Sequence, residues 1–256
     1  MSHKLIVTVC EMNDQPALFE HDWTRLCAHV KESGSQLVLL PEMPFCAWFA
    51  LPRQFDTDVW QNAVKAHENW LARLAELSPA VVATSRPVNL DGKRLNQAYL
   101  YDHEAVYPAH QKYYLPNEDG FWEAEWYQRG DGDFSLIENR GIQMGFLLCT
   151  ELWFMQCARD YGQNGAHLIL SPRASGRHTV EKWLVAGRAA AMISGAYSLS
   201  SNHCDPTADF GGTGWVIDPD GQVLAKTSLQ EPFVSVEIDL DKAVEAKTTY
   251  PRYVLE

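Results

Sequence analysis

GFLLCTELW, residues 145–153, is the stretch that we expect to decide the fold. Its apolar run stops at Cys149 and polar residues follow at once, which is typical of a buried strand that ends at the rim of a sheet. Residues 150–161 then carry apolar side chains at helical spacing until two glycines end the pattern, and residues 166–170 form another apolar run. The predicted order is therefore strand, cysteine, helix, strand.

Cys149 is a candidate nucleophile because of this position. A thiol at the start of a helix lies near unpaired backbone N–H groups and the positive end of the helix dipole, and both lower its pKa and favour the thiolate. The alternative is a cysteine of the core, since free cysteine is among the residues most often buried. The stretch alone leaves both interpretations open.

The rest of the chain alternates between strand-like and helix-like patterns. We expect strands over 5–9, 36–40, 80–85, 97–101, 106–112, 199–202, 215–217, 222–225 and 233–238, and helices over 17–32, over 58–77 and after a capping Thr179. This alternation predicts an α/β layer architecture, while the hairpins predict mixed sheets. We expect a single domain over residues 1–256, with a mobile loop at 205–214 and an apolar tail at 241–256 that packs on the domain or on a second subunit.

Composition argues against several classes of partner. With 33 acidic against 21 basic residues the formal charge is −12, so nucleic acid and anionic membranes are poor partners. No apolar run is long enough for a transmembrane helix and the first residues do not resemble a signal peptide, so we expect a cytoplasmic protein. The six cysteines form no Cys-x-x-Cys pair and the histidines show no metal-ligand spacing, so neither disulfides nor a metal site are expected.

Two charged residues close apolar strands as Cys149 does. Glu42 follows the run 36–40 after a proline, at the kind of strand end where catalytic groups of open α/β sheets gather. Lys112 closes the run 106–112, before two tyrosines that are able to desolvate it in part. Taken singly, a solvated loop acid and a surface lysine are the simpler interpretations. A fold that aligns these strands would bring base, cation and thiol to one rim.

Three motifs resemble those of the nitrilase, or carbon–nitrogen hydrolase, superfamily. They are LPE at 40–42, QKYYLP at 111–116 and FLLCTE at 146–151, and the late hairpin at 215–225 is similar as well. The resemblance covers about residues 5–240. It implies a four-layer α-β-β-α sandwich with two mixed sheets, commonly assembled into homodimers or larger homo-oligomers. It also implies a Glu-Lys-Cys triad, here Glu42, Lys112 and Cys149, that needs no metal or cofactor.

The resemblance also implies a fourth catalytic residue. Members of the family often have a further glutamate between the lysine and the cysteine, upstream of a Gly-Asp pair. With Gly130-Asp131 as that pair, Glu123 fits best, and Glu118 and Glu125 remain candidates.

The implied reaction is hydrolysis of a small amide or N-carbamoyl compound, with release of ammonia or an amine. Cys149 attacks the carbonyl carbon, Glu42 shuttles the protons, and Lys112 with the N–H of Thr150 stabilises the oxyanion. The product of the first step is a thioester, which water then hydrolyses. Glu123 is expected to hold the lysine or the substrate amide.

Other functions compete with this one. Nitrile-cleaving members usually have tryptophan directly after the catalytic cysteine, whereas this chain has Thr150, although Glu151 is shared with that branch. A non-catalytic binding member of the fold is a second alternative, which the presence of all three triad residue types argues against. A Ser-His-Asp hydrolase is weaker still, because the chain has no Gly-x-Ser-x-Gly turn.

Five further residues are candidates for substrate binding. Arg173 follows the strand after the nucleophile's helix, where a guanidinium would bind a substrate carboxylate with two hydrogen bonds; pairing with an acidic side chain of the protein is an equal alternative. Four aromatic side chains are candidates for an apolar pocket, although each one singly is better explained by core packing. They are Phe45, Trp48, Trp122 and Trp153.

Overall fold

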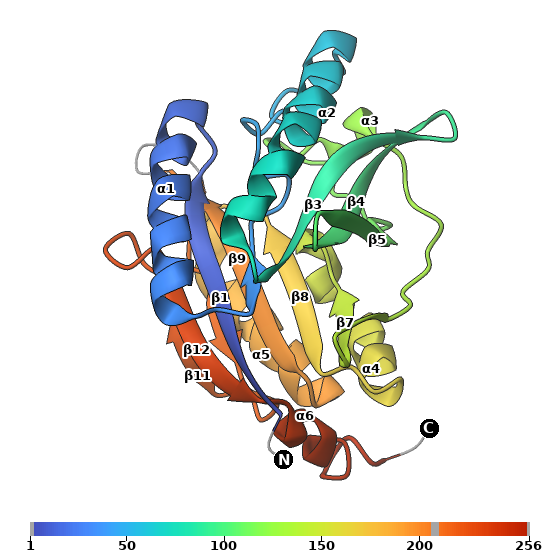
Figure 1. Cartoon of the computed structure of the whole chain (residues 1–256). Helices are drawn as coiled ribbons and strands as arrows, with labels where there is room; N and C mark the ends of the chain where they lie inside the picture. Colours follow the sequence, from blue (N-terminus) through green and yellow to red (C-terminus); the bar gives the residue numbers. More distant parts are fainter. Residues whose placement is uncertain (1–2, 206–209, 255–256) are drawn as a thin grey trace.

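The structure, a computed structural model, describes residues 3–205 and 210–254 (Figure 1). Its helices are α1 (Pro16–Ser33), α2 (Thr57–Leu71), η1 (Ala72–Leu77), α3 (Glu123–Trp126), η2 (Cys149–Trp153), α4 (Met155–Gln163), η3 (Arg177–Thr179), α5 (Val180–Ser194) and α6 (Leu240–Ala246), where η marks 3-10 helices. Its strands are β1 (Lys4–Asn13), β2 (Leu37–Leu39), β3 (Val81–Leu90), β4 (Lys93–Asp102), β5 (Ala105–Gln111), β6 (Ile137–Asn139), β7 (Ile142–Phe146), β8 (Leu168–Arg173), β9 (Tyr197–Cys204), β10 (Trp215–Ile217), β11 (Val223–Lys226) and β12 (Phe233–Asp239).

The strands form one hydrogen-bonded network in the order β5-β4-β3-β2-β1-β9-β8-β7-β6. Pairing is parallel from β3 to β7 and antiparallel at both ends, and β12 and β10 add antiparallel pairs to β1 and β9. The prediction of mixed sheets is therefore confirmed. The two sheets are not separate, however, because β1 pairs with β12 through residues 4–10 and then with β9 through residues 11–13.

Apolar cores separate the layers of the molecule. Leu37 and Leu39 of β2 face the core between the two halves of the sheet, whereas Val38 and Leu40 face the helix α1, as the alternation of a strand requires. On the opposite side, residues such as Leu147 and Ile169 pack against α4 and α5. This layering is the predicted α-β-β-α sandwich.

The helix expected after the cysteine is broken. Residues 149–153 form the 3-10 turn η2, and α4 begins only at Met155, because Phe154 between them has φ −89° and ψ 77°, outside the helical region. The expected tail is also partly regular, since it begins within α6, whose Ala243 packs in the core between the sheet halves. Residues 206–209 of the expected mobile loop lie outside the described residues.

The connections leaving one rim of the sheet carry the candidate residues. Glu42 lies just beyond β2, Cys149 just beyond β7, and Lys112 follows β5, while Arg173 ends β8. Segments far apart in the sequence are thereby brought together. Over residues 3–205 and 210–254, no helix is long and apolar enough to span a bilayer.

Candidate active site

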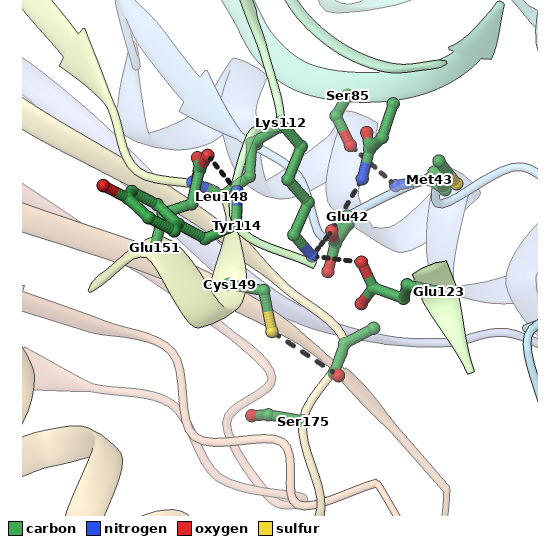
Figure 2. A network of polar contacts seen from close by, with 12 residues as sticks. Glu42, Met43, Ser85, Lys112, Tyr114, Glu123, Leu148, Cys149, Glu151 and Ser175 are labelled. Carbon is green, nitrogen blue, oxygen red and sulfur yellow. Dashed lines mark hydrogen bonds and ion pairs between the residues drawn. The ribbon is translucent and has the colours of Figure 1, made fainter. Parts of the chain in front are cut away.

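Cys149 is the first residue of η2, at the sharp turn that follows β7. Its φ of +48° is in the left-handed region, which a residue with a Cβ adopts only where its surroundings enforce it. The side chain is buried, and Sγ lies 3.7 Å from the carbonyl oxygen of Ala174 (Figure 2). Burial, and then the Glu42 carboxylate, raise the pKa of the thiol far above its ordinary value. The expectation of a thiolate at a helix start is therefore wrong, and the protonated thiol needs a base.

Glu42 is the carboxylate whose charge acts most strongly on the thiol. Its main chain is fixed on both sides, since its N–H donates to the carbonyl oxygen of Arg173 at 3.3 Å and its own carbonyl accepts from His203 Nε2 at 2.6 Å. The side chain is completely buried. Oε1 accepts hydrogen bonds from Lys112 Nζ and Asn96 Nδ2, each at 2.7 Å, while Oε2 has no hydrogen-bond partner among the described residues.

Lys112 lies between two carboxylates. Its Nζ is 2.7 Å from Glu42 Oε1 and 2.6 Å from Glu123 Oε2, and all three side chains are completely buried (Figure 2). Burial lowers the lysine pKa, but the carboxylates of Glu123 and Glu42 outweigh this effect, so the pKa is raised and Lys112 is an ammonium. Glu42 and Lys112, expected at one rim from their strand ends, and Glu123, expected from the resemblance, therefore form one cluster.

Of the three candidate glutamates, Glu123 is the one in this cluster. Glu118 is exposed, and Glu125 forms a 3.1 Å ion pair with Arg53 at the surface. Glu123 begins α3, and the hydroxyl of Tyr127 donates a hydrogen bond to its Oε2. Burial raises the pKa of Glu123 to about 7, a rise that the neighbouring ammonium opposes only in part. Two carboxylates thus share one ammonium.

Glu151 anchors the turn that carries the cysteine. Its buried carboxylate accepts four hydrogen bonds, from Leu148 N at 2.9 Å and His110 Nε2 at 2.8 Å on Oε2, and from Tyr113 N at 2.7 Å and Tyr114 N at 3.4 Å on Oε1. The two tyrosines directly follow the lysine of the cluster. One side chain therefore connects the main chain before the cysteine with the main chain after the lysine (Figure 2).

Comparison of the chain with known protein families identifies its family. The model of the carbon–nitrogen hydrolase family matches residues 7–248. The chain belongs to this family. It is 26 % identical over 239 residues to the omega-amidase NIT2 of Bos taurus, in a match that covers 89 % of this chain and 86 % of that protein.

Solved structures of carbon–nitrogen hydrolases have the same fold. The carbon–nitrogen hydrolase from Helicobacter pylori G27 superposes with a TM-score of 0.86 at 21 % identity, covering 98 % of this chain and 94 % of that one. For an amidase mutant from Nesterenkonia sp. AN1, in which the acetamide moiety of fluoroacetamide is added covalently at the active-site cysteine, the TM-score is 0.78 at 21 % identity, covering 95 % and 93 %. The resemblance seen in the sequence is confirmed: this carbon–nitrogen hydrolase is of the amidase-like branch and acts on non-peptide C–N bonds.

Two of the predicted aromatic residues lie in or against the apolar cluster that contains Ala174. Trp48 is buried in an aromatic core that also contains Phe210 and Ala174, the residue whose carbonyl faces the thiol. Trp122 is half-buried and packs against the same core. Both positions are compatible with a pocket wall.

The other two aromatic residues lie elsewhere. Phe45 stacks on Trp70 with the ring centroids 5.0 Å apart, in the core beneath α1, so it is a core residue as the simpler interpretation had it. Trp153 is 43 % exposed and packs against Trp183, 5.0 Å away. The side chain of Trp153 therefore covers the outside of η2.

Arg173 is buried, and its guanidinium donates hydrogen bonds to other residues of the protein. Its guanidinium lies over the ring of Trp215 and donates from Nε to Ser200 Oγ, from Nη1 to Ser175 Oγ and from Nη2 to the carbonyl oxygen of Thr213, at 2.6–2.7 Å. Among the described residues no carboxylate pairs with it, and burial lowers its pKa to about 9. The expected ion pair with an acidic side chain is therefore not found among the described residues, and the clamp for a substrate carboxylate stays a prediction.

Three polar residues of the site were not foreseen. Tyr127 had one local signal, since it lies four residues after Glu123 and hence one helical turn away. Asn96 had none, because its partner Glu42 comes from a distant segment of the chain. Glu151 belongs to the FLLCTE motif and accepts from Leu148 N three residues before it, but its contacts with His110 and with the main chain after Lys112 join distant segments. In the described ranges, no group of three or more His, Cys, Asp or Glu side chains is arranged to hold a metal ion.

Proposed function

We propose that this carbon–nitrogen hydrolase cleaves a small amide or N-carbamoyl compound through a thioester on Cys149. The observation that carries the proposal is the buried cluster in which Lys112 bridges Glu42 and Glu123 within electrostatic reach of the thiol. The omega-amidase relative supports amide cleavage here, and the covalent acetamide adduct in the Nesterenkonia amidase supports a nucleophilic cysteine.

In the first half of the reaction Cys149 Sγ attacks the carbonyl carbon. The thiol proton moves to Glu42 Oε2, the oxygen without a partner, and the carbonyl π electrons move to oxygen. The Lys112 ammonium and the N–H of Thr150, in the first turn of η2 where backbone donors lack helical acceptors, stabilise this oxyanion. When the C–N bond breaks, the departing nitrogen takes the proton from Glu42.

The second half removes the acyl group with water. Glu42 accepts a proton from a water molecule as the water oxygen attacks the thioester carbon. Lys112 and the N–H of Thr150 again stabilise the oxyanion. The C–S bond then breaks and the sulfur takes back its proton. Glu42 therefore acts twice as base and twice as acid, and the cycle ends with the enzyme unchanged.

The acyl group is proposed to be uncharged. The Arg173 guanidinium already has three neutral partners, and Trp48 and Phe210, 4 % and 7 % exposed, belong to the apolar cluster of Ala174, whose carbonyl oxygen faces the thiol. Thr150 in place of a tryptophan favours amides over nitriles.

A substrate panel tests this proposal. We expect ammonia release from small aliphatic amides or from N-carbamoyl compounds, and slower release from the matched nitriles, measured at equal enzyme concentration. The Cys149→Ala protein is the control for ammonia that the site does not produce. Absence of release from every amide and carbamoyl compound, with correctly folded enzyme, would refute the proposed function.

The pH dependence provides a second test. Because burial raises the pKa of Glu123 to about 7 and the ionised carboxylate is the stronger acceptor for the substrate N–H, kcat/KM is expected to fall as the pH falls through about 7. In Glu123→Gln this fall of kcat/KM at acid pH, the acid limb of the profile, should vanish, since the glutamine side chain does not titrate. A profile that is flat between pH 6 and 8 in the wild-type enzyme contradicts the assignment.

A further inference from the structure

Each carboxylate of the cluster has one occupied and one unoccupied oxygen. Glu42 Oε1 and Glu123 Oε2 both accept a hydrogen bond from the same ammonium, and each accepts one further hydrogen bond. Glu42 Oε2 and Glu123 Oε1 are buried without a hydrogen-bond partner among the described residues. Buried polar atoms of this kind are rare and call for an explanation.

Asn96 supplies the further hydrogen bond to Glu42. Its Nδ2 donates to Glu42 Oε1 at 2.7 Å, and its main-chain oxygen accepts from Lys112 N at 2.9 Å. The residue is completely buried in β4. A single asparagine therefore fixes the general base with its side chain and the catalytic lysine with its backbone.

Tyr127 supplies the corresponding hydrogen bond to Glu123. Its hydroxyl donates to Glu123 Oε2, and the ring is held by Trp60, with the centroids 6.0 Å apart. Tyr127 is 1 % exposed, so its ring has no freedom to turn toward solvent. The hydrogen bond favours the ionised form of Glu123.

We infer that Asn96 and Tyr127 are positioning residues that leave one oxygen of each carboxylate for the reaction. An oxygen that already accepts two hydrogen bonds binds a proton only if one of them breaks, so the thiol proton goes to Glu42 Oε2 and the substrate N–H goes to Glu123 Oε1. This inference rests on the proposed function and specifies which atoms carry it out.

The Asn96→Ala variant tests the first role. Without the amide the Glu42 carboxylate is free to rotate about Lys112, and we expect kcat to fall about ten- to a hundredfold with little change in KM. The matched control is Asn139→Ala, which removes an asparagine hydrogen bond of 3.1 Å to Asp102 away from the cluster and should leave both constants unchanged.

The Tyr127→Phe variant tests the second role and keeps the packing of the ring. Loss of the hydroxyl removes a donor that favours ionised Glu123, so the acid limb of kcat/KM should move upward from about pH 7. Tyr197→Phe is the control, because it removes the partly buried 3.0 Å hydrogen bond to the carbonyl of Asp239 and should change stability without moving the acid limb.

The outcomes separate this inference from the proposed function. A wild-type enzyme that hydrolyses amides, with Asn96→Ala and Tyr127→Phe showing wild-type kcat and pH profile, overturns the positioning roles and leaves the function standing. A loss of kcat in Asn96→Ala together with a shifted limb in Tyr127→Phe supports them. A wild-type enzyme without activity on the whole panel overturns both.

Discussion

Cys149→Ala and Cys149→Ser are expected to lower amide turnover to the background rate, a loss of at least about a thousandfold, because the proposed reaction passes through a bond to sulfur. Alanine offers no nucleophile. Serine has a hydroxyl that is harder to deprotonate than the thiol, in a site where burial already raises the pKa of the native group. Ammonia release under saturating substrate measures the effect.

The fold should survive these substitutions. Alanine and serine each have a Cβ, as cysteine does, so a φ of +48° strains all three alike. The main chain there is held by the hydrogen bond from Leu148 N to Glu151 and not by the thiol. Circular dichroism and urea unfolding provide the check, and Cys27→Ala on α1, half-buried and outside the cluster, is the matched control that should retain full activity. Near-normal turnover by folded Cys149→Ala would show that sulfur is not the nucleophile.

Local patterns predicted the architecture well where one face of an element is apolar. Helix α1 was expected over 17–32 and is found at Pro16–Ser33, because its side chains at helical spacing, such as Trp23 and Val30, meet a buried sheet face. Strand ends were located in the same way, since an abrupt change from apolar to polar residues marks the sheet rim. Glu42, Lys112 and Cys149 all lie just past such changes.

Long-range contacts explain what the local patterns missed. Residues 149–161 carry a helical pattern, yet the first five form a 3-10 turn because Glu151 is bound to the main chain after Lys112. The helix start that was expected to ionise the thiol is therefore absent, and burial decides its pKa instead. Asn96 was missed for the same reason, since its partner Glu42 is 54 residues away in the sequence.

Glu151→Gln is expected to cost about 3–5 kcal/mol in the free energy of unfolding, the range found when one member of a buried ion pair is removed. All four partners of the carboxylate are donors: three backbone N–H groups and His110 Nε2. An amide has one acceptor oxygen, so its NH2 group must face N–H groups with nothing to accept its protons. Urea unfolding measures the loss.

The pH dependence of this loss follows from His110. Its pKa is raised in the folded protein from an ordinary 6.5, since Glu151 outweighs the lowering effect of burial. The ionic contribution is therefore fully present below pH 6.5 and is lost as the pH rises through the higher folded value. The difference in stability between wild type and Glu151→Gln should accordingly be larger at pH 6 than at pH 9.

The same substitution should impair chemistry at the cysteine. The turn at Cys149 is in the left-handed region, and the one acceptor oxygen of glutamine cannot replace both the oxygen that binds Leu148 N and the oxygen that binds Tyr113 N in the lysine segment. We expect iodoacetamide labelling of Cys149 to slow by about tenfold or more even where the variant is folded, because reacting groups misplaced by about 1 Å lose that much rate or more.

Glu138→Gln is the control. That exposed glutamate accepts a backbone hydrogen bond from Gly141 on one oxygen, and the oxygen of an amide can accept the same bond. Equal stability and labelling in the two variants would show that the cysteine turn does not depend on its buried acceptor.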